Sequence, residues 1–67
     1  MSDQVENRLK VLRAERNITQ EELGNACALS RQSINAIEKG KYVPTIVSAL
    51  KIAKYFNVPI EKIFTLK

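Results

Sequence analysis

The 67-residue sequence contains no histidine, one cysteine, two glycines and two prolines. Without histidine it lacks the usual general base near neutral pH and the commonest metal ligand. One cysteine cannot form an internal disulfide, so an oxidising compartment is not indicated. No apolar run approaches the about 20 residues of a membrane span, and Asp3 and Glu6 stand where a signal peptide would be basic. We therefore expect a cytoplasmic protein without catalytic activity, metal, cofactor or small-molecule ligand.

The scarcity of glycine and proline also leaves no stretch that resembles a linker, and no internal repeat is present. A chain of this length has room for one small core, because a domain of about 60 residues buries only roughly 60% of its unfolded surface. We therefore expect a single domain over residues 1–67, with its core between residues 5 and 64.

Positive charge is concentrated in one part of the chain, which has a net charge of +4. Residues 30–54 carry five Lys or Arg and one acid, Glu38, so this segment accounts for the whole excess. A segregated basic surface suits phosphate binding. Bases that only solvate helix faces would give the same count, so charge alone leaves both interpretations open.

The first two expected helices differ in how clearly they begin. One extends from about Gln4 to Arg16, capped by Ser2 or Asp3, because its apolar residues recur at helical spacing; Asn17 is a plausible left-handed end. The next begins at Thr19, which forms a capping box with Glu22. Flanking Ile18 and Leu23 are spaced as a hydrophobic staple around this cap.

Three more short helices are expected further along the chain. The third is capped by Ser30, covers about residues 31–39 and ends at Gly40. Thr45 caps the fourth, which is expected to bury Ile46, Ala49, Leu50, Ala53 and Phe56 and to stop at Asn57. After Pro59 comes a last helix, Ile60 to Phe64, although Ile63 to Leu66 could add a short strand. The expected fold class is all-α, with five short helices.

The second and third helices are separated only by Ala28, Leu29 and Ser30. Helices joined so closely must cross steeply, as in a helix-turn-helix, whose second helix fits the DNA major groove. Arginine can bond guanine bidentately, and glutamine or asparagine can bond adenine. The start of the third helix offers such groups, although polar first-turn residues are also ordinary solvated positions: Arg31, Gln32, Ser33 and Asn35.

The ordered set of motifs from Leu9 to Phe64 resembles the lambda-repressor/Cro-like (XRE) family of helix-turn-helix DNA-binding proteins. The matching segments are Leu12-Arg13, Thr19-Gln20-Glu21-Glu22-Leu23, Ser30-Arg31-Gln32-Ser33-Ile34, Ile37-Glu38-Lys39-Gly40-Lys41, Pro44-Thr45, Leu50-Lys51-Ile52-Ala53 and Asn57-Val58-Pro59-Ile60-Glu61-Lys62-Ile63-Phe64. The resemblance implies a lambda-repressor-like domain whose helix-turn-helix is formed by the second and third helices.

The resemblance also implies roles for single residues. Gln20 matches a phosphate-contacting position at the start of a helix, where anions are favoured. Arg13 and Glu38 match an ion pair that ties the first helix to the end of the third. The implied DNA-binding residues are Gln20, Ser30, Arg31, Gln32, Ser33, Asn35, Lys39, Lys41 and Tyr42.

The sequence departs from the family pattern at the turn. Ala28 stands where glycine is common, so a positive φ there would cost about 1–2 kcal/mol. Gly24 stands where alanine is usual and where helices approach closely, at a cost of roughly 1 kcal/mol of helix propensity. Cys27 between them is interpreted as a small buried apolar residue, with a redox sensor as the alternative.

The C-terminal segment is rich in large apolar residues, more than one side of a five-helix domain needs. Family members usually bind palindromic operators as dimers, with half-sites about 34 Å apart. We therefore expect a homodimer, unless the core takes all of these side chains. The expected contact residues are Phe56, Val58, Ile60, Phe64 and Leu66.

Taken together, the sequence predicts a sequence-specific double-stranded DNA-binding transcriptional regulator, in the form of a repressor. The alternative is an antitoxin or protein-interaction adaptor that uses the same fold. One polar set argues against that alternative, because protein-binding surfaces favour aromatic anchors: Gln20, Arg31, Gln32 and Asn35. No phosphate loop, metal cluster or paired-carboxylate spacing supports an enzyme.

Overall fold

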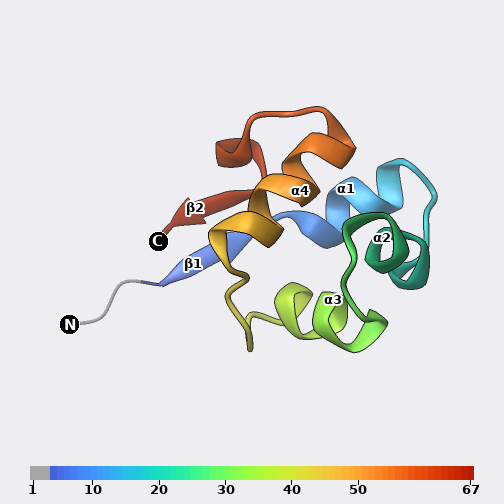
Figure 1. Cartoon of the computed structure of the whole chain (residues 1–67). Helices are drawn as coiled ribbons and strands as arrows, with labels where there is room; N and C mark the ends of the chain where they lie inside the picture. The colour runs from blue at the N-terminus through green and yellow to red at the C-terminus, as the bar shows by residue number, and fades with distance from the viewer. Residues whose placement is uncertain (1–3) are drawn as a thin grey trace.

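A computed structural model describes residues 4–67 of the chain. Figure 1 shows a mostly helical arrangement in which the first and last elements are short strands. The elements are β1 (Val5–Asn7), α1 (Leu9–Glu15), α2 (Gln20–Cys27), α3 (Arg31–Glu38), α4 (Ile46–Phe56), a 3-10 helix η1 (Ile60–Lys62) and β2 (Phe64–Leu66).

The prediction of five helices was wrong in the nature of the last helix, and the predicted start of the first helix was also wrong. Over the described residues the structure has four α-helices, and a single 3-10 turn takes the place of the fifth. The first helix begins at Leu9 rather than near Gln4, because Val5–Asn7 pairs with another strand. The caps expected at Ser2 or Asp3 lie outside the described residues.

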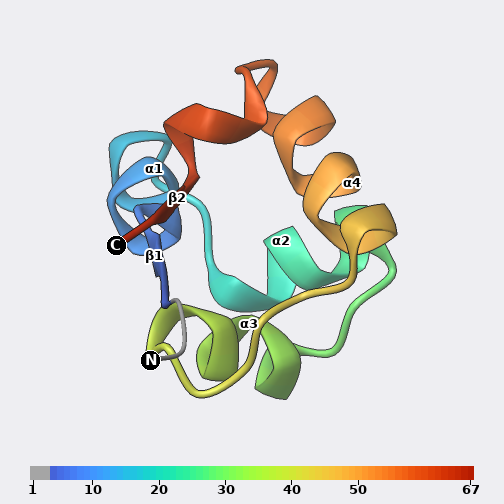
Figure 2. The ribbon, with the colours of Figure 1, turned by 90° about the vertical axis from the view of Figure 1, so that its left-hand side faces the viewer.

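β1 and β2 form an antiparallel ladder that joins the two ends of the described chain. Val5 pairs with Leu66 and Asn7 with Phe64. Beyond the ladder, the Lys67 amide donates to the Gln4 carbonyl at 2.8 Å. The strand that the sequence left open after Ile63 is thus present, and both strands lie on the side of the molecule that faces the viewer in Figure 2.

The starts of α2, α3 and α4 follow the predicted caps. The Thr19 hydroxyl accepts from the Glu22 amide at 3.0 Å, and the Glu22 carboxylate accepts from the Thr19 amide at 2.9 Å. Ser30 caps α3 and Thr45 caps α4 in the same way, each accepting from the amide three residues on. These caps satisfy backbone donors that the first turn leaves unpaired, and they fix where each helix begins.

The turn between α2 and α3 explains both departures from the family pattern. Ala28 has φ 58°, in the left-handed region, where a Cβ costs about 1–2 kcal/mol. A Cβ on Gly24 would lie 2.5 Å from the Leu29 carbonyl oxygen, so only glycine fits there. The Leu29 amide donates to the Gly24 carbonyl at 2.8 Å and holds this close approach.

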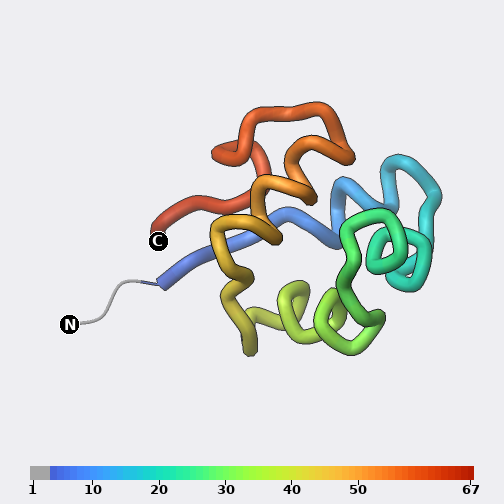
Figure 3. The backbone as a smooth tube through the Cα atoms, in the orientation of Figure 1, coloured from blue at the N-terminus to red at the C-terminus, as the bar shows by residue number. Residues whose placement is uncertain are grey.

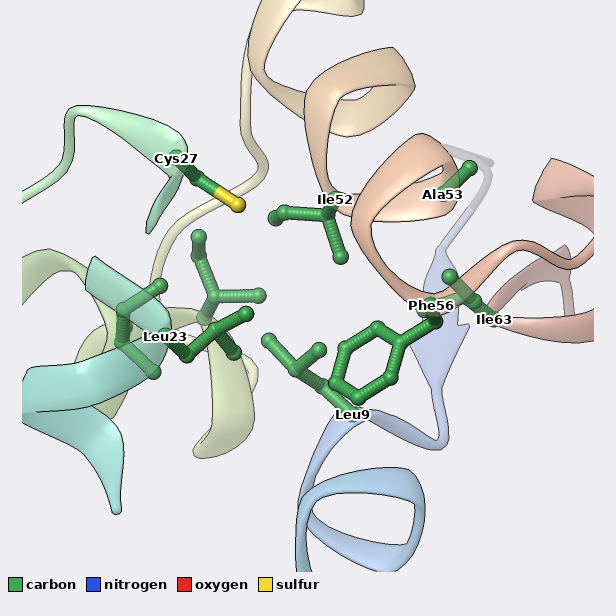
Figure 4. Packing of buried hydrophobic residues seen from close by; sticks show 9 residues of the cluster. Leu9, Leu23, Cys27, Ile52, Ala53, Phe56 and Ile63 are labelled. Atoms are coloured by element: carbon green, nitrogen blue, oxygen red, sulfur yellow. The ribbon is translucent and has the colours of Figure 1, made fainter. Parts of the chain in front are cut away.

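The core gathers side chains from every helix and from the segment before β2 (Figure 4). Its buried members are Leu9, Leu23, Cys27, Ile34, Ile37, Ile52, Ala53, Phe56 and Ile63. Two expectations for α4 were wrong: Ile46 and Leu50 are 67% and 52% exposed, whereas Ile52 is fully buried. Among the described helices, none has the length and apolar character needed to cross a membrane.

The buried state of Phe56 also corrects the expected dimer contact. Its ring is fully buried in the core, so it cannot contact a second copy in this fold. Val58, Ile60 and Phe64 pack partly against the core, whereas Leu66 is 71% exposed. Most of the apolar surplus of the C-terminal segment is therefore used inside the domain.

Candidate nucleic-acid interface

The pair α2 and α3 crosses steeply, as the backbone trace in Figure 3 shows. Ile34 and Ile37 anchor α3 in the core. The same helical spacing turns Arg31 and Gln32 outward, and both are exposed in the first turn. The helix therefore presents its polar start to solvent from a fixed apolar base, which is the geometry of a helix that enters a DNA groove.

A partly buried ion pair links the end of α3 to α1. Arg13 Nε donates to Glu38 Oε2 at 2.7 Å, and Nη2 donates to Oε1 at 3.2 Å. The Glu38 side chain is only 5% exposed, and its hydrogen bond raises the pKa of Arg13. Arg13 Nη1 also donates to the Ile18 carbonyl at 2.9 Å. One guanidinium thus joins α1, the loop before α2, and the end of α3.

Gln20 extends this network to the middle of α3. Its Nε2 donates to Glu38 Oε1 at 3.1 Å and to Asn35 Oδ1 at 3.2 Å. An amide nitrogen carries two hydrogens, so these two bonds use both. The structure thereby brings four of the predicted site residues into one hydrogen-bonded group: Arg13, Gln20, Asn35 and Glu38.

A hollow of 520 Å³ lies between the start of α2 and the start of α3. Its lining includes Thr19, Gln20 and Glu21 at the start of α2 and Arg31 at the start of α3. The α2 N-terminus carries the positive end of the helix dipole, and Arg31 adds a full positive charge, whereas the Glu21 carboxylate in the same lining repels an anion. An anionic oxygen is therefore favoured near Arg31 and the first backbone amides of α2, away from Glu21.

The loop after α3 places three further predicted residues in the open. Lys39 ends α3, and Lys41 and Tyr42 follow, all exposed. Gly40 separates the two lysines with φ 75°, as expected for a helix end. Lys51 and Lys54 instead lie on α4, where they line a hollow of 300 Å³ together with Cys27 of α2. The basic residues of this segment are therefore divided between two places, α3 with the loop after it and the later part of α4.

Two polar contacts that support α3 and α4 were missed from the sequence. Asn7 Nδ2 donates to the Ile37 carbonyl at 2.8 Å, and its Oδ1 accepts from the Leu9 amide at 3.2 Å. Arg16 donates to the Phe56 carbonyl. Asn7 was assigned to a helix, and no local pattern marks a side chain whose partner lies thirty residues away.

Cys27 is a core residue rather than an exposed thiol. Its side chain is 1% exposed, and burial raises its pKa, with a smaller opposing effect of Lys51. A raised pKa disfavours the reactive thiolate. The apolar interpretation is the one that this environment supports.

The fold and the exposed first turn of α3 define a helix-turn-helix protein of the DNA-binding class. The family profile described as helix-turn-helix matches residues 9–63. The chain therefore belongs to the XRE-type helix-turn-helix family.

Curated relatives share this domain. The chain is 55% identical over 60 residues to an HTH-type transcriptional regulator of Methanocaldococcus jannaschii, covering 90% of this chain and 91% of that protein. It is 44% identical over 63 residues to the HTH-type regulator YgzD of Bacillus subtilis, covering 94% and 96%. It is 33% identical over 57 residues to the cryptic phage CTXphi transcriptional repressor RstR of Vibrio cholerae, covering 85% and 51%.

Solved structures share the fold. The crystal structure of a protein of Bacteroides fragilis superposes with a TM-score of 0.81 at 26% identity, covering 91% of this chain and 98% of that one. The restriction-modification controller protein C.AhdI of Aeromonas hydrophila superposes with a TM-score of 0.77 at 27% identity, covering 82% and 83%.

Proposed function

We propose that residues 1–67 form one domain that binds double-stranded DNA at specific sequences and represses transcription in the cytoplasm, as a homodimer on a palindromic operator and without catalysis. The observation that carries the proposal is the exposed polar first turn of α3, held by the buried group around Glu38. The family assignment and the regulator names of the relatives agree with it.

We assign the contacts with DNA bases to the first turn of α3. Arg31 can bond guanine O6 and N7, and Gln32 can bond adenine N6 and N7. Ser33 and Asn35 lie beside them, and the Gln20 amide holds the Asn35 oxygen. Asn35 therefore offers its amide hydrogens more readily than its oxygen, which favours acceptor groups on the base edge.

We assign contacts with the DNA phosphate backbone to residues around the first turn of α3. Because both Nε2 hydrogens of Gln20 are engaged, we assign its phosphate contact to the backbone amide at the start of α2. Ser30, which caps α3, lies at the edge of the same turn. Lys39, Lys41 and Tyr42 contact phosphates from the loop after α3 and set the position of the helix in the groove.

Selection of bound duplexes from a random pool tests the proposal directly. We expect the selected sequences to form a palindrome with half-sites about 34 Å apart. Gln32→Ala should then cost about 1–3 kcal/mol on the selected site and nothing on random DNA. Gln4→Ala, the same change at an exposed residue of the N-terminal segment, is the matched control. A pool without enrichment, or equal losses on both duplexes, would contradict sequence-specific binding.

Repression is favoured over activation because so small a domain has little surface to recruit polymerase, and the relative RstR is named a repressor. Added protein should lower transcription in vitro from a promoter that carries the selected site. Increased transcription would contradict the repressor role.

A second candidate, an antitoxin or protein-interaction adaptor, draws on one observation: four large apolar side chains are exposed near the start of α4. This candidate predicts no enrichment of any duplex, together with a partner protein that co-elutes in a fixed ratio. Enrichment of a palindrome would exclude it as the main function.

A further inference from the structure

Asn7 of β1 contacts the last turn of α3, thirty residues further along the chain. Its Nδ2 donates to the Ile37 carbonyl at 2.8 Å, and its Oδ1 accepts from the Leu9 amide at 3.2 Å. Only this orientation of the side-chain amide satisfies both partners, because a carbonyl accepts and a backbone N–H donates. One partly buried side chain therefore joins the start of α1 to the end of α3.

The Ile37 carbonyl is also the acceptor on which the turn after α3 closes. The Gly40 amide donates to this carbonyl at 3.0 Å, and the next amide, that of Lys41, donates to the Ala36 carbonyl at 2.9 Å. Gly40 has φ 75°, which turns the chain out of the helix. The bond from Asn7 therefore supports the carbonyl that sets where α3 ends and in which direction the following loop leaves.

The same loop also rests against the ladder of β1 and β2. A hollow of only 10 Å³ is lined by Val5 and Phe64 of the ladder and by Tyr42 and Pro44 of the loop. A space of this size holds no more than about one water molecule, so the ladder and the loop nearly touch. Asn7 itself lies in the ladder, opposite Phe64. Figure 2 shows β1 beside the end of α3 and the start of this loop.

The last turn of α3 thus has two supports of different kinds. Arg13 of α1 holds the side chain of Glu38, whereas Asn7 of β1 holds the backbone of the preceding residue. A helix end with one anchor can pivot about that anchor. Two anchors from different elements fix the direction of the helix as well as its position.

We propose that Asn7 is a positioning residue for DNA recognition, a role that rests on the proposed function. Asn7 acts through the Ile37 carbonyl, and it keeps the base-contacting turn of α3 and the phosphate-contacting loop in one fixed arrangement. Specific binding needs both sets of contacts at once, because the phosphate contacts position the base contacts. Non-specific binding depends on charge alone and tolerates a displaced loop. Loss of the Asn7 support should therefore reduce discrimination between duplexes.

Asn7→Asp separates this role from the start of α1. The carboxylate still accepts from the Leu9 amide, but when ionised it cannot donate to the Ile37 carbonyl. We expect the ratio of the dissociation constants on random DNA and on the selected duplex to fall about 5–10-fold, as for the loss of one hydrogen bond. Repulsion between the added charge and phosphates acts on both duplexes and cancels in this ratio. Fluorescence anisotropy with labelled duplexes measures it.

Two further variants control for the charge. Asn7→Ser keeps a hydroxyl that can accept from the Leu9 amide but is too short to reach Ile37, and it should give the same loss without added charge. Asn25→Asp makes the same change as Asn7→Asp at an exposed residue of α2 and should leave the ratio unchanged. Far-UV circular dichroism checks that each variant is folded.

A measurement without DNA tests the support itself. Amide hydrogen exchange followed by NMR should become about 5–10-fold faster at Gly40 and Lys41, relative to the Leu23 amide of α2, in Asn7→Asp. Ala53→Gly weakens α4 through helix propensity and controls for a general loss of stability. It should change neither the relative exchange rates nor the discrimination between duplexes.

Unchanged relative exchange rates in Asn7→Asp would overturn the inference, and so would faster exchange with unchanged discrimination. An equal loss of discrimination in Asn7→Asp and Ala53→Gly would overturn it as well, because Asn7 would then contribute only to stability. A wild-type chain that discriminates between no duplexes would instead overturn the proposed function, while the exchange rates would still decide whether Asn7 holds the end of α3.

Discussion

The two surfaces joined by the loop 39–45 are built in opposite ways. At α3, exposed polar side chains stand on a support that contains a partly buried ion pair, with the Glu38 side chain 5% exposed. At the start of α4, exposed aliphatic side chains project from a segment without charge. The first surface depends on how precisely its side chains are held, and the second on how much apolar area it offers. Substitutions at α3 should therefore act through the position of its side chains, whereas substitutions at α4 should act according to whether the replaced side chain is buried or exposed.

The largest effect is expected from breaking the support of α3. Arg13→Met leaves the buried Glu38 carboxylate without its guanidinium and should lower the free energy of unfolding by about 3 kcal/mol. The double variant Arg13→Met, Glu38→Leu removes both charges and should recover at least half of that loss. Urea unfolding followed by circular dichroism measures both. A single variant as stable as the double one would show that the pair does not act as a unit.

A second comparison separates core from surface on α4. Ile52→Ala should cost about 3 kcal/mol, because Ile52 is fully buried. Leu50→Ala, two residues earlier and 52% exposed, should change the stability of the monomer by less than about 0.5 kcal/mol. Thermal unfolding at a concentration at which the chain is monomeric measures the two. Equal losses would mean that Leu50 belongs to the core and not to the exposed surface of α4.

The turn that carries α3 allows a smaller change of opposite sign. Ala28→Gly removes the left-handed strain at φ 58° and should raise the free energy of unfolding by about 1 kcal/mol. The control Ala26→Gly, in the last part of α2, should lower it by about 0.5–1 kcal/mol. If both changes destabilise the protein, the turn is not strained at Ala28.

The smallest effect concerns the loop between the two surfaces. Lys41→Ala should weaken binding to all duplexes and lower the slope of log affinity against log salt by about 0.9 for one lost phosphate contact. Lys54→Ala, on α4 and away from the loop, should leave the slope unchanged. Filter binding over a salt series distinguishes the two, and equal slopes for both variants would remove Lys41 from the contact set.

Local chemistry made much of the helix-turn-helix predictable from the sequence. Thr19 and Glu22 form a reciprocal cap within one turn, and Gly40 and Asn57 end helices in the left-handed region. Each of these features depends on residues a few positions apart, so the sequence contains nearly all of the relevant information. The Arg13–Glu38 pair joins distant residues and was implied only by the family resemblance.

The errors in the predicted secondary structure and core have two causes. In one case the pairing partner is distant in sequence, and in the other both faces of a helix are apolar. Val5 fits a helical period with Leu9, yet it pairs with Leu66 at the other end of the chain. On α4, Ile46, Leu50 and Ile52 are all aliphatic, so periodicity cannot distinguish the buried side from the exposed one. Which side faces inward was decided by the packing of α2 and η1.

The ladder between β1 and β2 has a consequence for how the protein folds. Its pairs, such as Val5 with Leu66, are among the most widely separated in sequence, so they close a loop that spans nearly the whole chain. Closing so long a loop is entropically costly until the intervening helices have shortened it. The ladder should therefore form last, with φ-values near zero in β2 and larger ones in α2 and α3. The hollow of 240 Å³ that Val5 and Phe64 help to line would then be completed only at the final step, so it is a property of the fully folded chain alone.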